Sequence, residues 1–213
     1  EASQFKSLKD LFTRHLDFSY REAPSEKHFL SPCDGQISAC GPLDQTGDGL
    51  LTIKGSGFCP RQLIGDDWFK LVSGGEYMVI YLSPKDYHHF HSPVPGLKEA
   101  ERRYFRGRKR TVKPESVDRF PLFLSENERV ACRYLDRHQQ PLIMVYVGAM
   151  IVGSIELNSH SNAVEQGENL GHFNFGSTVV VFTPPGYTKE SLLKNKGAVQ
   201  LFDPLGELSY EVK

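Results

Sequence analysis

The chain has 213 residues, of which 39% are hydrophobic and 11% aromatic, enough to bury one sizeable core. Its 25 Lys and Arg residues nearly balance 26 Asp and Glu residues, so the formal net charge of -1 argues against a nucleic-acid-binding protein and against an acidic tail. No apolar run reaches the roughly 20 residues that cross a bilayer as a helix, and the longest, 141–155, is interrupted by glycines. We therefore expect a single domain over residues 1–213 that does not cross a membrane.

Cysteine usage gives little material for a metal site or a disulfide scaffold. The four cysteines stand at irregular spacing without a Cys-x-x-Cys pair: Cys33, Cys40, Cys59 and Cys132. This pattern favours no bound metal and a reducing, cytoplasmic setting. The chain begins at Glu1 without an initiator Met or a signal peptide, which leaves room for a leader or anchor removed from a longer gene product.

Along the chain, the first twenty residues differ in pattern from the rest. Apolar side chains at positions 5, 8, 11, 12 and 16 follow a helical period and predict one amphipathic helix. From Pro32 onward, short apolar runs rich in Val, Ile, Tyr and Phe, such as 77–82, 142–147 and 178–182, indicate strands. We expect an α+β fold that is predominantly β, an antiparallel sandwich- or barrel-like domain with a short N-terminal amphipathic helix.

The stretch 102–110 places six cations and two aromatic residues in nine positions. Charge runs of this kind usually face water, which here would mean a solvated hairpin or loop. They can also contact anionic lipid headgroups, where each cation contributes about 1 kcal/mol near the surface. Both interpretations stay open, whereas RNA binding is disfavoured because the rest of the chain is not basic.

A Gly-Ser step, Gly176-Ser177, stands directly before the apolar run 178–182. Glycine leaves its carbonyl sterically open and tolerates strained backbone geometry, so the Ser177 hydroxyl could attack it. The resulting ester could eliminate across the serine Cα–Cβ bond, and hydrolysis would leave an N-terminal pyruvoyl group. Taken alone, a Gly-Ser pair mostly indicates a turn.

Two other segments supply groups that could activate this serine. Residues 30–35 read Leu-Ser-Pro-Cys-Asp-Gly, and the stretch 81–93 contains Asp86 followed by His88, His89 and His91. A serine becomes a nucleophile when a base takes its proton, and a histidine oriented by a carboxylate is the recurring solution. Asp34, His91 and Ser177 could form such a triad. The alternatives are a β-turn at Asp34-Gly35 and, for the histidines, a polar loop or an adventitious metal site with Asp86.

These segments occur in order with Asn-Glu-Arg-Val at 127–130 and Val-Gly-Ala-Met-Ile-Val-Gly-Ser-Ile at 147–155. Together they resemble the phosphatidylserine decarboxylase proenzymes of the bacterial and mitochondrial type, from Phe5 to about Pro185. The resemblance implies self-cleavage between Gly176 and Ser177, giving a β chain 1–176 and an α chain 177–213. It also implies that Asp34 and His91 activate the serine, and that His88 acts in decarboxylation.

The same resemblance implies the reaction and its partners. Phosphatidylserine would be converted to phosphatidylethanolamine and CO2 by a covalent pyruvoyl group derived from Ser177, without a metal. The expected partners are the phospholipid, an anionic surface at the cytoplasmic face of the cell membrane where the protein is peripheral, its own two fragments and a second copy in a homodimer, but no nucleic acid. His88 is the expected proton donor, since an imidazole of ordinary pKa near 6.5 can donate at neutral pH.

Departures from the family pattern leave the reacting groups intact. Cys33, His89 and Phe175 stand where the family commonly has alanine, arginine, and leucine or glycine, and His15 replaces a usual proline. Three alternative functions remain open: pyruvoyl-dependent decarboxylation of a soluble amino acid, a non-catalytic lipid-headgroup-binding module, and a serine hydrolase using the same triad. The last is disfavoured because no Gly-x-Ser-x-Gly elbow surrounds Ser177.

Overall fold

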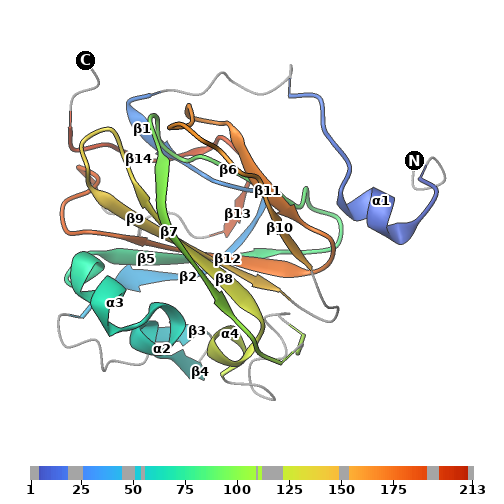
Figure 1. Cartoon of the computed structure of the whole chain (residues 1–213), viewed down its shortest axis with the longest axis horizontal. Helices are drawn as coiled ribbons and strands as arrows, with labels where there is room; N and C mark the ends of the chain where they lie inside the picture. The colour runs from blue at the N-terminus through green and yellow to red at the C-terminus, as the bar shows by residue number, and fades with distance from the viewer. Residues whose placement is uncertain are drawn as a thin grey trace.

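A seven-stranded antiparallel sheet runs through the middle of the molecule (Figure 1). The computed structural model describes residues 5–18, 26–44, 51–53, 56–108, 110–111, 122–148, 154–190 and 197–210. In spatial order the strands are β13 (Gly197–Val199), β2 (Gly35–Pro42), β5 (Glu76–Leu82), β12 (Ser177–Thr183), β9 (Pro141–Gly148), β8 (Arg129–Leu135) and β7 (Lys98–Phe105). The three apolar runs predicted as strands are β5, β9 and β12, which confirms the predominantly β, antiparallel fold.

Smaller elements cover the two faces of this sheet (Figure 1). On one face lie the three-stranded sheet β10 (Ile155–Leu157), β11 (Asn169–Phe173) and β6 (His89–His91), and the pair β1 (His28–Leu30) and β14 (Pro204–Glu207). On the other lie α2 (Pro60–Ile64), α3 (Asp66–Val72), α4 (Phe123–Glu126) and the hairpin β3 (Leu51–Ile53) and β4 (Ser56–Phe58). The result is a layered arrangement with the long sheet in the centre.

Two apolar clusters fill the spaces between the layers. The first packs the long sheet against the small sheets, and the second packs it against α2, α3 and α4. Because side chains alternate along a strand, Val179 and Val181 of β12 enter the first cluster while Val180 and Phe182 enter the second. Ser177 has the parity of Val179, so its side chain faces the first layer.

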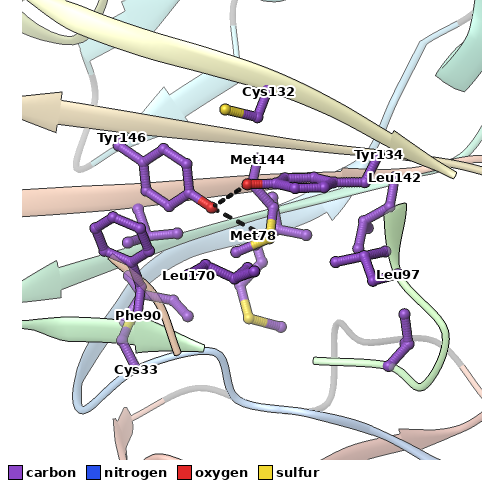
Figure 2. Close-up of a cluster of buried hydrophobic side chains, with 14 of the residues drawn as sticks. Cys33, Met78, Phe90, Leu97, Cys132, Tyr134, Leu142, Met144, Tyr146 and Leu170 are labelled. Atoms are coloured by element: carbon purple, nitrogen blue, oxygen red, sulfur yellow. Dashed lines mark hydrogen bonds between the residues drawn. The ribbon is translucent and has the colours of Figure 1, made fainter. Parts of the chain in front are cut away.

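Figure 2 shows how the first cluster accommodates two tyrosine hydroxyls. The hydroxyls of Tyr134 and Tyr146 lie 3.0 Å apart, and that of Tyr146 also donates to the Met144 sulfur at 3.8 Å. Both side chains are almost completely buried, so this bond satisfies groups that water cannot reach. The surrounding side chains are apolar or cysteines, and all four cysteines of the chain are free.

The N-terminal helix α1 spans only Leu8–Phe12, shorter than the apolar spacing predicts. Ser7 caps its start by accepting the Asp10 amide at 3.1 Å. At its end, the Arg14 guanidinium donates to Leu11 O and also to the carbonyls of Lys85 and Asp86, at 2.9 and 3.1 Å. The last two bonds tie the end of α1 to the loop before β6.

No helix in the described residues is long and apolar enough to cross a membrane.

The basic stretch begins within the edge strand β7 rather than in a hairpin loop. Arg102 pairs with Glu99 at 2.7 Å, and Arg103 pairs with Asp67 while its guanidinium lies 4.0 Å from the Trp68 ring centre. Further along, Arg110 pairs with Glu126 at 2.9 Å. Carboxylates of the same chain therefore neutralise much of this positive charge.

The central position of β12 predicts a large cost for truncating its side chains. Phe182→Ala should lower the free energy of unfolding by about 3–5 kcal/mol, because the ring is fully buried and its removal leaves a cavity. Leu71→Ala, at a side chain 40% exposed, is the matched control and should change stability far less. Urea denaturation followed by tryptophan fluorescence measures both, and equal losses would contradict the assigned core.

Candidate active site

Ser177 opens β12 between Leu82 of β5 and Gly148 of β9. Its side chain is fully buried, and its Oγ has no hydrogen-bond partner among the described residues. A Cβ built on Gly176 would meet nothing within 4 Å, so space remains beside that backbone. Gly176 does not adopt a left-handed φ; residues 174–176 form a bend directly before β12.

His88 lies just before β6 and is held by its backbone and by its ring. The Phe173 amide donates to His88 O at 2.9 Å, and His88 Nδ1 lies 2.9 Å from Asp86 O. A carbonyl oxygen only accepts, so Nδ1 carries the hydrogen and Nε2 is the basic nitrogen of the neutral ring. That Nε2 is buried and has no hydrogen-bond partner within the described part of the chain.

Phe12 of α1 joins His88 to the serine segment. Its ring centre lies 4.5 Å from that of His88 and 5.5 Å from that of Phe175, two residues before Ser177. Phe12 is itself 5% exposed, so the three rings keep water from this part of the molecule. Burial lowers the pKa of His88 to about 4, although the Asp86 carbonyl and carboxylate oppose the shift. The resting ring is therefore a neutral base at pH 7, so His88 can act as a proton donor only after it has taken up a proton.

Asp34 and His91 each contact the turn at Leu201–Phe202, and the Asp34 carboxylate also acts on the His88 ring, where it opposes the lowering of the pKa by burial. Asp34 Oδ1 accepts the Leu201 amide at 2.7 Å, and the His91 ring centre lies 5.8 Å from that of Phe202. Gly35 brings this segment against β5, because a Cβ there would stand 2.5 Å from Tyr81 O. Only glycine allows that approach, at a φ of +156°.

The His91 ring is oriented by two hydrogen bonds. Nδ1 donates to Gly167 O at 2.8 Å, and Nε2 lies 3.3 Å from the Tyr87 hydroxyl, which must then be the donor. Phe90 enters the first apolar cluster, so alternation along β6 places His91 on the opposite face of that strand. Ser177 and His88 are thus linked through Phe12 and Phe175, whereas Asp34 and His91 are linked through the turn at Leu201–Phe202.

His89 shares the outer face of β6 with His91. It donates from Nε2 to Thr13 O at 3.1 Å, accepts at Nδ1 from Asn169 at 2.8 Å, and stacks on Tyr87 with ring centres 4.7 Å apart. Burial lowers its pKa to about 4. With both nitrogens bonded to protein atoms, His89 acts here as a structural link between α1 and β11 and not as a metal ligand.

Sequence reasoning missed Phe12, Tyr87 and Ser154 as parts of this region. Tyr87 stands inside the histidine segment, so its position there was an available signal. The sequence around Phe12 shows only a helical period, which does not indicate a contact with His88. The place of Ser154 in this region follows only from the pairing of β9 with β12.

The burial of His88 predicts that its ring takes up a proton only at low pH. Between pH 8 and 5.5 its ring resonances should stay constant in NMR spectra, because the folded chain keeps a neutral imidazole until about pH 4. Stability should fall as pH drops from about 6.5 toward 4, since only the unfolded chain then binds this proton. In Phe12→Ala the midpoint should rise, because water reaches the ring. A midpoint near 6.5 in the unmodified protein would contradict the buried placement.

Comparison with known proteins identifies the family of this chain. The family model described as "Phosphatidylserine decarboxylase" matches residues 8–206. The "Phosphatidylserine decarboxylase proenzyme" of Marinobacter nauticus is 35% identical over 96% of this chain and 78% of its own length. Proteins of the same name from Nitrosococcus oceani and Helicobacter pylori are each 35% identical, over 97% and 95% of this chain and 76% and 80% of their own lengths. The chain belongs to the phosphatidylserine decarboxylase family.

Proposed function

We propose that this protein decarboxylates phosphatidylserine to phosphatidylethanolamine, using a pyruvoyl group that it makes from its own Ser177. The observation that carries the proposal is a buried serine hydroxyl without a hydrogen-bond partner among the described residues, preceded by a glycine with open space at its Cα. The ring of Phe12 links this segment, through Phe175, to His88, a neutral base. The relatives named proenzymes support the self-processing part of it.

The surroundings of Ser177 suit a pyruvoyl group. The Ser177 Oγ has no hydrogen-bond partner among the described residues, so its conversion to a pyruvoyl group would break no hydrogen bond of that atom. Ser177 lies at the buried start of β12, which is paired with a strand on each side. When formed, the group supplies a ketone that condenses with the substrate's amine and accepts the electrons left when CO2 departs. His88 Nε2 is a basic atom linked to this segment through Phe12 and Phe175, whose rings limit access of water.

Cleavage would proceed through an ester at Ser177. The Oγ bonds to the Gly176 carbonyl carbon, the peptide C–N bond breaks, and the Ser177 nitrogen takes a proton. Loss of the Cα proton then expels the Gly176 carboxylate, and water releases ammonia from the dehydroalanine. Following the family resemblance, we assign the activation of Ser177 to Asp34 and His91. The contacts through Phe12 make His88 Nε2 a second candidate base, so the two histidines must be tested separately.

His88 has a defined proton-transfer role in the decarboxylation stage. The substrate amine must lose a proton before it can react, and the neutral Nε2 can accept it. The ring, then charged, can return that proton to the carbon that has lost CO2. A depressed pKa is consistent with this cycle, because the ring is a base at the start and a strong proton donor afterwards.

After cleavage the two fragments should remain one folded body. The fragment from residue 177 contributes β12, β13 and β14, which pair with β5 and β9, with β2 and with β1 of the other fragment. We further propose that the protein acts peripherally at the cytoplasmic face of the membrane, where a phospholipid substrate is presented.

Variants at the four predicted residues should separate the two stages. Ser177→Ala, Asp34→Ala and His91→Ala should leave a full-length chain, because each removes a group needed for the acyl shift. His88→Ala should cleave but lose decarboxylation by at least about 100-fold. A denaturing gel with intact mass measures cleavage. His138→Ala, at an exposed ring, should behave as the unmodified protein. Cleavage of His91→Ala at the normal rate would transfer the base role to His88.

Substrate comparison tests the headgroup assignment. Vesicles containing phosphatidylserine should release CO2, whereas free serine and tryptophan should not, if the lipid is the substrate. Release from a free amino acid alone would favour a soluble substrate. A chain that stays uncleaved but binds vesicles would favour a non-catalytic module, and labelling of Ser177 by a fluorophosphonate would favour a hydrolase.

A further inference from the structure

Ser154 is a second buried serine beside the proposed cleavage site. It precedes β10, is 1% exposed, and its Oγ has no hydrogen-bond partner among the described residues. Its carbonyl accepts the Asn174 amide at 2.8 Å, which ties its backbone to the segment leading into Gly176. A buried hydroxyl without a partner is costly, so its retention here needs a reason.

Strand pairing places this hydroxyl next to Ser177. Gly148 is the residue of β9 that pairs with Ser177. The Gly148 N–H donates to Glu128 O at 3.0 Å and the Gly148 C=O accepts from Asn127 Nδ2 at 3.1 Å, so both polar groups point toward β8 and away from β12. The pair is therefore of the non-hydrogen-bonded kind, in which side chains of the two residues lie closest. A Cβ on Gly148 would stand 2.2 Å from Ser154 Oγ. Ser154 thus fills the place of the missing side chain, within roughly 7 Å of the Ser177 Cβ.

The same pairing sets the direction of the scissile carbonyl. Because the backbone N–H and C=O of Gly148 point away from β12, the backbone N–H and C=O of Ser177 point to the other side, toward Leu82 of β5. In a trans peptide the C=O of one residue points opposite to the N–H of the next. The Gly176 carbonyl oxygen is therefore directed toward β9 and its end at Gly148, which is where the Ser154 hydroxyl lies.

We propose that Ser154 is a further catalytic residue of self-cleavage, whose hydroxyl donates a hydrogen bond to the Gly176 oxygen as Ser177 attacks. The proposal rests on the proposed function. When the Ser177 Oγ bonds to the Gly176 carbon, the carbonyl electron pair moves onto oxygen, and a donor fixed in a dry site stabilises that charge. A donor of this kind points to where the negatively charged oxygen forms during the reaction, and not to the carbonyl oxygen before reaction. This explains why the Ser154 hydroxyl has no hydrogen-bond partner among the described residues of the uncleaved chain.

Gly148 has a defined part in this arrangement. Its lack of a side chain is what leaves room for Ser154 Oγ beside Ser177. A methyl group at this position would displace the hydroxyl without removing it. Ser154→Ala and Gly148→Ala therefore perturb the same contact from its two sides.

The test is the rate of self-cleavage in freshly synthesised protein, followed by gel and intact mass. Ser154→Ala should slow cleavage by about 100- to 1,000-fold, the usual effect of losing one oxyanion donor. Gly148→Ala should slow it in the same direction. Thr183→Val is the matched control, because it removes a buried hydroxyl at the far end of β12. It should cleave normally, and thermal melting checks that each variant folds.

Hydroxylamine identifies the step that is affected. It cuts an accumulated ester and leaves a Gly176 hydroxamate, so it should not release fragments from Ser154→Ala if ester formation is what fails. Fragments released by hydroxylamine would place the defect in elimination and overturn the proposal, as would cleavage of folded Ser154→Ala at the normal rate. If the unmodified chain never cleaves, the proposed function itself is wrong. If Ser154→Ala does not fold, normal cleavage of folded Gly148→Ala would overturn the inference.

Discussion

The register of β12 between β5 and β9 is the constraint on which the site depends. Seven consecutive residues pair with β5, and six of them also pair with β9, so Ser177 cannot shift along the strand. A slip by one residue would turn its side chain to the opposite layer and bring Thr178 to the face now occupied by Ser177. The apolar run 179–182 fixes that register, because each of its side chains belongs to one of the two buried clusters.

The alternation of side chains along β6 likewise determines on which face of the strand each histidine lies. Phe90 is anchored in the first cluster against Tyr146 and Phe173, with ring centres 4.0 and 5.1 Å away. His91 then lies on the opposite face of the strand, where Gly167 and Tyr87 orient its ring. His88, before the strand, is instead held by the Asp86 carbonyl and covered by Phe12. Both rings are buried, but their hydrogen-bond partners differ.

The sequence predicted the strands at 77–82, 142–147 and 178–182 because each is a nearly continuous apolar run, buried on both faces. It also predicted roles for Asp34, His88, His91 and Ser177, through motifs whose order carried the family resemblance, and these roles stay predictions. It could not predict that α1 ends at Phe12, or that Arg14 just beyond it bonds to the carbonyls of residues 85 and 86, far away in sequence. The low pKa of His88 and the position of Ser154 were equally hidden, since both depend on contacts distant in sequence.

The distribution of strands between the two fragments of the proposed cleavage has a consequence for refolding. Before cleavage the chain can close its central sheet by itself, at a rate independent of concentration. Once the bond before Ser177 is cut, the same sheet needs two molecules to meet, and the shorter one, detached, exposes the apolar strand β12. Maturation therefore makes denaturation close to a one-way event, so the working life of the mature protein is set by its rate of unfolding.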